Sequence, residues 1–182
     1  MSDYKEMERD YDSDRGRDCR DCVRCRRPGH PLPKPILFEC GTGSGFSMSD
    51  GGPTTIACLA NTERALGTVV LDTTCLCQPK CMIQFSSNVH FVPDNGSGEV
   101  ELLFQLFRSC DGGQELQLDS WTFKIDDEGD IFSQTFSFFY CDCNSCPGCC
   151  TYSIRCKPCV VDDCSICVND CHIAGFAREG CS

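Results

Sequence analysis

Hydrophobic and polar residues alternate along much of the chain with a period of two, which is the period of a β-strand. The clearest case is Glu99–Arg108, whose apolar face is made of Val100, Leu102, Phe104 and Leu106. Such a segment is typical of a strand with one face in the core and the other in solvent. No segment shows convincing helical periodicity, so we expect no amphipathic helix.

Short runs of this kind recur from residue 36 onward, and turn-forming residues separate them. In Ile131–Tyr140 one face carries Phe132, Phe136, Phe138 and Tyr140, and the opposite face carries Ser133, Thr135 and Ser137. The pattern predicts an all-β fold, a β-sandwich or jelly roll of about eight or more strands. The expected strands are Ile36–Cys40, Thr54–Leu59, Gly67–Asp72, Cys81–Phe85, Asn88–Val92, Glu99–Arg108, Glu115–Leu118, Trp121–Ile125, Ile131–Tyr140 and Cys150–Arg155.

Turn signals stand between these runs at Asp94–Gly96, Asp111–Gly113 and the acidic Asp126–Asp130. We interpret the last as a hairpin turn, because the glutamate at the twelfth position of a calcium loop is absent. The glycine-rich Gly41–Gly45 lacks the Gly-Lys-Ser/Thr of a phosphate-binding loop. We therefore expect a flexible loop between strands at Gly41–Gly45.

The first part of the chain has a different composition. Up to Arg27 it carries eight basic and eight acidic residues and almost nothing apolar to bury. A segment of this composition is predicted to be disordered in a free monomer, and the prolines that end it favour an extended spacer. Two units are therefore expected, a flexible N-terminal connector arm at 1–34 and a cysteine-rich β-sandwich domain at 35–182.

The most informative feature of the composition is its cysteine content, since the chain has 20 cysteines in 182 residues. Cysteine-dense domains are usually small, and their hydrophobic cores are too small to stabilise the fold without disulfides. A domain of this size can be stabilised by burial alone. The cysteines therefore point to another role, such as covalent linkage between chains, durability or metal binding.

The formal net charge of −11 argues against a nucleic-acid partner, because neutralising phosphates requires a basic surface. The N-terminal residues contain no apolar stretch of the secretory type, and no window approaches the roughly 18 apolar residues of a membrane span. We expect neither a secretory signal nor a membrane span.

The arm cysteines Cys19, Cys22 and Cys25 have no core of their own to stabilise, so they are candidates for disulfides between subunits. Adjacent cysteines and CxC pairs rarely bond internally, which favours different partners for each member. The candidates for receiving or intradomain disulfides are Cys40, Cys58, Cys75, Cys77, Cys81, Cys110, Cys141, Cys143, Cys146, Cys149 and Cys150.

An alternative use of cysteine is zinc binding, for which paired CxxC motifs supply four soft ligands. Cys156, Cys159, Cys164 and Cys167 have the required inner spacing, although only four residues separate the two pairs. No other cofactor is expected. A cysteine nucleophile paired with one of the three histidines would arise easily by chance among twenty cysteines, so we expect no enzyme.

Four motifs carry a resemblance to a known family: PKPILFECGTG at 33–43, LDTTCLC at 71–77, TFSFFYCDC at 135–143 and CCTY at 149–152. Over roughly residues 33–155 the chain resembles a family of uncharacterised cysteine-rich proteins from spore-forming anaerobic bacteria. Its architecture is similar to endospore-appendage subunits, which are jelly-roll proteins with a flexible N-terminal connector.

That architectural resemblance implies a structural protein that assembles with copies of itself into a disulfide-cross-linked fibre or layer. It also implies a location on the spore surface, outside the cell, reached without a signal peptide. The connector role would fall on Cys19, Cys22 and Cys25, and the alternative remains a cytosolic zinc-binding module.

Overall fold

The computed structural model describes residues 36–49, 63–94, 96–127, 130–143, 145 and 147–180. The arm at 1–34, the expected strand Thr54–Leu59, and Cys58, Cys146 and Cys181 lie outside these residues. The described residues form no helix, and hence none that could cross a membrane. The all-β prediction is confirmed.

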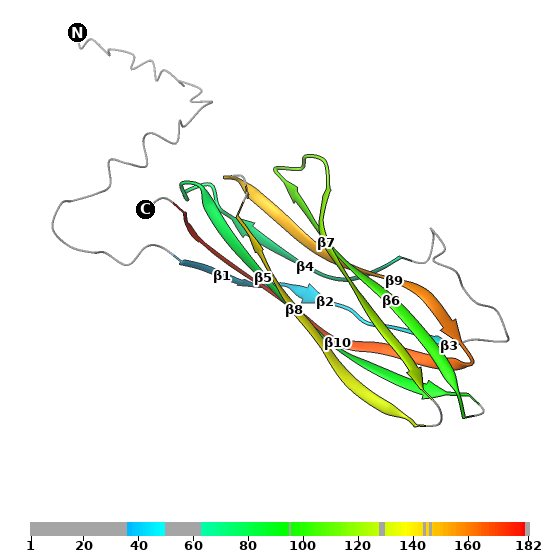
Figure 1. Ribbon diagram of the computed structural model, residues 1–182. Coiled ribbons are helices and arrows are strands. Elements are labelled where there is room, and N and C mark those ends of the chain that lie inside the picture. Colours follow the sequence, from blue (N-terminus) through cyan, green and yellow to red (C-terminus); the bar gives the residue numbers. More distant parts are fainter. Residues whose placement is uncertain are drawn as a thin grey trace, which may run out of the picture. The chain divides into compact units, whose positions relative to one another are not determined.

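The described strands form two antiparallel sheets, which Figure 1 shows as two layers. Sheet A has the order β1-β10-β5-β8, with β3 also paired to β10, and sheet B has the order β2-β4-β9-β6-β7. The strands are β1 Ile36–Cys40, β2 Thr42–Gly43, β3 Phe46–Ser49, β4 Arg64–Asp72, β5 Pro79–Pro93, β6 Gly98–Cys110, β7 Leu116–Asp127, β8 Phe132–Asp142, β9 Cys149–Asp162 and β10 Cys164–Glu179.

This order is that of a jelly roll, in which most consecutive strands alternate between the two sheets. Among the described strands, only β6 and β7 form a hairpin of consecutive strands, through the expected turn at Asp111–Gly113. The prediction of a hairpin at Asp126–Asp130 was wrong, because β7 belongs to sheet B and β8 to sheet A. Turn residues reverse the chain direction, but they do not determine which sheet the next strand joins.

The core lies between the sheets and consists of the inward positions of the alternating strands. On β6 the four predicted inward residues, Val100 to Leu106, are fully buried. Aromatic side chains fill the side where β7 and β8 form the sheet edges: Trp121 stacks on Phe138 at 3.7 Å and Phe136 on Phe104 at 4.1 Å between ring centroids. These rings join the two layers across that side.

The opposite side of the sandwich is closed by the chain from Ile36 to Ser49, which moves from sheet A to sheet B and back. Gly41, Gly43 and Gly45 lie where it passes between β4 and β10. A Cβ atom at Gly41 would lie 1.9 Å from the Thr68 carbonyl oxygen, and one at Gly43 would lie 2.0 Å from that of Cys171. The glycines permit this close passage, so the prediction of a flexible loop was wrong.

Candidate functional site

Several strand ends and turns that carry cysteine meet at one end of the sandwich. The register places Cys149 beside Asp72, Asp142 beside Cys81 and Cys150 beside Cys110. We call this region the cysteine end. Its described cysteines are Cys75, Cys77, Cys81, Cys110, Cys141, Cys143, Cys149 and Cys150.

Cys110 and Cys150 form a disulfide within the domain, between the last residue of β6 and the second residue of β9. Their Cα atoms are 4.0 Å apart, and 40 positions separate them in the sequence. The bond therefore joins two central strands of sheet B where both reach the cysteine end. Cys159, farther along β9, is disulfide-bonded as well.

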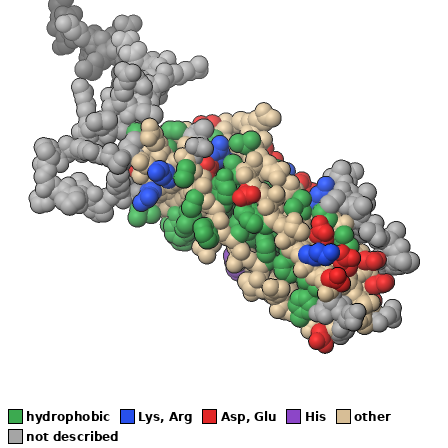
Figure 2. Space-filling model, viewed as in Figure 1, with side chains coloured by type: hydrophobic (Ala, Val, Ile, Leu, Met, Phe, Trp, Pro, Cys, Tyr) green, Lys and Arg blue, Asp and Glu red, His purple; other side chains and the backbone are tan. Residues whose placement is uncertain are grey.

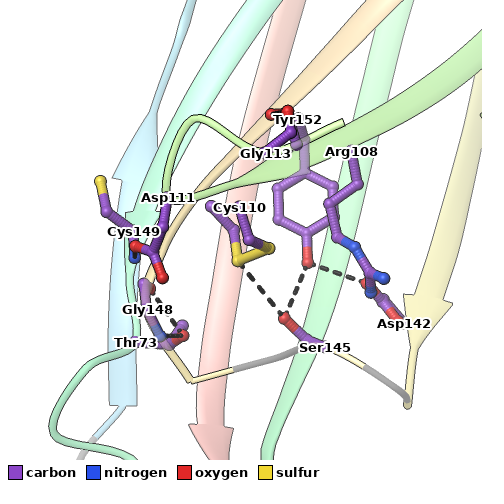
Figure 3. Close-up of a disulfide and its surroundings, with 12 residues drawn as sticks. Thr73, Arg108, Cys110, Asp111, Gly113, Asp142, Ser145, Gly148, Cys149 and Tyr152 are labelled. Carbon is purple, nitrogen blue, oxygen red and sulfur yellow. Dashed lines mark hydrogen bonds and ion pairs between the residues drawn. A yellow bond between two sulfur atoms is a disulfide. The ribbon is translucent and has the colours of Figure 1, made fainter. Parts of the chain in front are cut away.

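A buried polar cluster lies beside this disulfide (Figure 3). Arg108 pairs with Asp142 at 2.5 Å, and the Tyr152 hydroxyl donates to the same carboxylate at 3.0 Å. Ser145 Oγ contacts the Tyr152 hydroxyl at 3.2 Å. Burial raises the pKa of Tyr152, so its hydroxyl stays protonated and available to donate. The cluster thus ties sheet B to the end of β8 in sheet A.

The segment that leads into β9 is held by two further sets of hydrogen bonds. Thr73 Oγ1 donates to the Gly148 carbonyl oxygen at 2.9 Å, and the Cys149 amide donates to Asp111 Oδ1 at 2.9 Å. Gly148 has φ of 145°, and a Cβ atom there would lie 2.4 Å from Asp111 Oδ2. These contacts fix the chain direction immediately before Cys149 and Cys150.

The described residues include five exposed free thiols: those of Cys75, Cys141, Cys143 and Cys149 lie at the cysteine end, and that of Cys40 lies at the end of β1. All five were among the cysteines expected to receive a disulfide or to bond within the domain. Exposure makes them available to another molecule. The arm cysteines Cys19, Cys22 and Cys25, expected to link subunits, lie outside the described residues, as do Cys58 and Cys146.

The outer face of sheet A next to these thiols is apolar. A cross-strand row runs Phe38–Phe176–Met82–Cys141 over β1, β10, β5 and β8, with the two phenylalanine rings 4.6 Å apart. Ile36 and Phe139 lie beside it and are about 70% exposed. A depression of about 410 Å³ lies here, lined by Ile36, Lys80, Cys81, Met82, Cys141, Cys143, Phe176, Ala177 and Arg178.

The other end of the sandwich has a different chemical character. Carboxylates gather at the ends of β5, β7 and β9, as Figure 2 shows for the face in view. Lys124 pairs with Glu99 at 2.8 Å within this group. Other described acidic residues here are Asp94, Asp126, Asp130, Asp162 and Asp163. Carboxylates thus occur at both ends of the sandwich, whereas none of the described exposed thiols lies at this end.

The four cysteines considered for zinc do not converge. Cys156 is buried between the sheets, Cys159 is disulfide-bonded, and Cys167 faces outward from sheet A. Burial raises the pKa of Cys156, which keeps this thiol protonated. No group of three or more metal-binding side chains occurs within the described part of the chain.

The sequence pattern did not identify the Arg108–Asp142–Tyr152 cluster. A signal for it was present, because Asp142 has the same phase along β8 as Phe136, Phe138 and Tyr140, which face inward. A carboxylate at an inward position requires a buried partner. The pattern alone did not indicate that Arg108 on another sheet supplies it.

The fold and the exposed thiols define a cysteine-rich jelly-roll protein. The chain belongs to the family described as "Domain of unknown function (DUF4489)", whose model matches residues 34–177. This match covers the four motifs that suggested a family of uncharacterised proteins, except for the first residue, Pro33. No curated protein matches the chain.

Among solved structures the chain is similar to a chain in the structure of infectious bursal disease virus Gt strain, with 11% identity and a TM-score of 0.43. The alignment covers 81% of this chain and 34% of the viral one. The corresponding values for the Gx strain are 11%, 0.40, 80% and 32%. The chain spans about a third of the length of these viral chains.

Proposed function

We propose that this protein is a structural subunit, not an enzyme, that assembles with copies of itself into a disulfide-cross-linked fibre or layer. In this proposal the assembly lies outside the cell on a spore surface, and the N-terminal arm links each subunit to a neighbour through Cys19, Cys22 or Cys25. The location follows from the family resemblance and from the oxidising conditions that disulfides need.

The observation that carries the proposal is the division of the cysteines between core and surface. The sandwich has a large apolar core of its own, whereas Cys40, Cys75, Cys141, Cys143 and Cys149 are exposed and free. Thiols in these positions contribute nothing to the core. They are placed where a cysteine from another chain can reach them, which is the requirement for a covalent link between subunits.

Two further features support assembly. Strands β7 and β8 each form an edge of their sheet, and an edge strand can pair with a strand from another copy. An arm of one subunit that bonds to a sandwich thiol of the next makes a head-to-tail contact, because two different surfaces meet. Repeated head-to-tail contacts build open filaments when the rotation between subunits does not close a ring.

The test is electrophoresis of the full chain after oxidative recovery, in detergent, with and without reductant. We expect a ladder of covalent oligomers that collapses to monomer when a thiol reductant is added. The triple variant Cys19→Ser, Cys22→Ser, Cys25→Ser should lose most of the ladder. The triple variant Asp18→Ser, Asp21→Ser, Arg24→Ser is the matched control, since it alters the arm but keeps its thiols.

Monomer alone in the non-reducing lanes would sink the proposal, and an unchanged ladder in the cysteine variant would remove the arm from it. Elemental analysis of protein purified under reductant addresses the metal-binding alternative. Near-stoichiometric zinc that is lost only to a chelator would favour that alternative. Electron microscopy of the oxidised material then distinguishes a fibre from a layer.

A further inference from the structure

Four small or polar side chains form a row across the outer face of sheet A, away from the cysteine end. The register aligns Ser47 on β3 with Cys167 on β10, Cys167 with His90 on β5, and His90 with Ser133 on β8. Residues directly opposite in an antiparallel pair have Cβ atoms about 4.5–5.5 Å apart. The Cys167 thiol and the His90 imidazole are therefore immediate neighbours on one face.

Ser133 fixes the orientation of the His90 ring. His90 Nδ1 lies 2.7 Å from Ser133 Oγ, which is a hydrogen bond across β5 and β8. When Nδ1 carries the proton and donates it to Ser133, Nε2 holds the free lone pair. The ring edge facing β8 is then occupied, and the opposite edge is on the side of β10, where Cys167 lies.

The surface around this pair is hollow, because the outward residues of β3 and β10 are small. A depression of about 270 Å³ is lined by Ser47, Met48, Ser49, His90, Val92, Ser165, Ile166 and Cys167. Cys167 is half-buried and its thiol is free. A small molecule can thus reach a thiol that stands next to a positioned imidazole.

We propose that Cys167 and His90 form a reactive-thiol site that exchanges with aliphatic disulfides. His90 Nε2 takes the proton of the Cys167 thiol, and the thiolate attacks one sulfur of the incoming disulfide. The Cys167–sulfur bond forms as the original sulfur–sulfur bond breaks. The departing thiolate takes the proton back from His90, so no additional oxidant or reductant is consumed.

Three other described thiols, of Cys141, Cys156 and Cys171, lack one of these properties. Burial raises the pKa of Cys171 to about 11, and it raises that of Cys156 as well, so both stay protonated. Cys141 is exposed on the same outer face as Cys167, but its cross-strand neighbour on β5 is Met82. Cys141 therefore serves as an internal reference for a thiol without an imidazole.

Few charges oppose the formation of the thiolate. The outward positions that flank the pair are uncharged on every neighbouring strand: Ser47 and Ser49 on β3, Ser165 and Asn169 on β10, Asn88 and Val92 on β5, and Ser133 and Thr135 on β8. Asp170 and Cys171 follow farther along β10. The Asp170 carboxylate acts against the thiolate, and imidazolium at His90 acts in its favour.

The experiment uses the full chain, reduced, desalted and treated at pH 7 with a small excess of 2-hydroxyethyl disulfide. Site-resolved mass spectrometry then follows the mixed disulfide on each cysteine over time. We expect Cys167 to react several times faster than Cys141, because His90 can accept the proton of the Cys167 thiol as it attacks. His90→Gln should bring Cys167 close to the rate of Cys141, and Ser133→Ala should lower it by a smaller factor.

The rate at Cys141 in each variant, together with the circular dichroism spectrum, controls for damage to the fold. Equal rates at Cys167 and Cys141 in the wild type would overturn the proposal, as would a His90→Gln variant that keeps the fast rate. Mapping of the disulfides in non-reduced oligomers then shows whether Cys167 bonds to a cysteine of another copy or to a small thiol. The ladder described above can form without Cys167, so the two proposals fail separately.

Discussion

Ser87 lies on β5 between Phe85 and Val89, inside the sandwich and only 1% exposed. Its hydroxyl oxygen has no hydrogen-bond partner among the described residues. A buried polar group without a partner loses its interaction with water and gains nothing in return. The hydroxyl is thus a cost to the stability of the core.

We predict that Ser87→Ala raises the free energy of unfolding by about 1 kcal/mol, because the desolvation of the hydroxyl is no longer required. Urea unfolding of the reduced monomer measures the change. Ser86→Ala is the matched control, since Ser86 is the neighbouring residue and faces outward from sheet A. A lower midpoint for Ser87→Ala than for the wild type would show that the hydroxyl is satisfied in solution.

The sequence shows how many cysteines the chain has, but not which of them are buried and which are exposed. A cysteine in a strand is buried or exposed according to the phase of that strand. Cys164 faces the core and Cys167 faces outward because they lie three residues apart on β10. Motif spacing pairs them as one CxxC ligand set, whereas the two faces of a strand separate them.

Among elements, the longest strand that was not predicted is β10, which is also the longest of the described strands and central to sheet A. Its inward residues are Cys164, Ile166 and Val168 before an irregularity at Asn169–Asp170, and Cys171 and Ile173 after it. The phase of the alternation therefore shifts by one residue. Asp170 has φ of 50°, which fits a bulge at this point.

The strand Ile36–Cys40 was predicted with the observed bounds, and the predicted Glu99–Arg108 lies within β6. Two pairs of predicted strands proved to be single strands. Cys81–Phe85 and Asn88–Val92 belong to β5, because the polar Ser86–Ser87 between them does not end the strand. Pairing on both sides with β10 and β8 holds these polar residues in the sheet.

Between β1 and β3 the backbone at Gly43 passes close to β10. Gly43→Ala would place a Cβ atom 2.0 Å from the Cys171 carbonyl oxygen, so β2 or β10 must shift. We expect a loss of about 1–3 kcal/mol in the free energy of unfolding, typical of overpacking. Thr42→Ala, at the adjacent exposed position, should change it by less than about 0.5 kcal/mol.

Thermal unfolding of the reduced monomers measures both variants against the wild type. A Gly43→Ala melting temperature equal to that of Thr42→Ala would mean that this segment detaches from the sandwich in solution. In that case the closure of this side would contribute little to the stability of the domain.

At the scale of the whole molecule, the core and the disulfides make separate contributions. The Cys110–Cys150 bond closes a loop of 40 residues, for which chain entropy predicts about 3–4 kcal/mol. A fully buried large apolar side chain contributes about 1.5–3 kcal/mol relative to an exposed one. The core contains many such side chains, including Phe85, Phe91 and Phe104. Burial therefore outweighs this cross-link.

We predict that a thiol reductant separates folding from assembly. In excess dithiothreitol the protein should keep its β-sheet circular dichroism spectrum and a cooperative thermal transition, with a lower melting temperature, while covalent oligomers disappear. The double variant Cys110→Ala, Cys150→Ala, measured without reductant, isolates the share of this one bond in the shift. If reductant abolished the cooperative transition, the fold of the monomer would depend on its disulfides. The separation between a core that stabilises the fold and exposed thiols that link subunits would then be wrong.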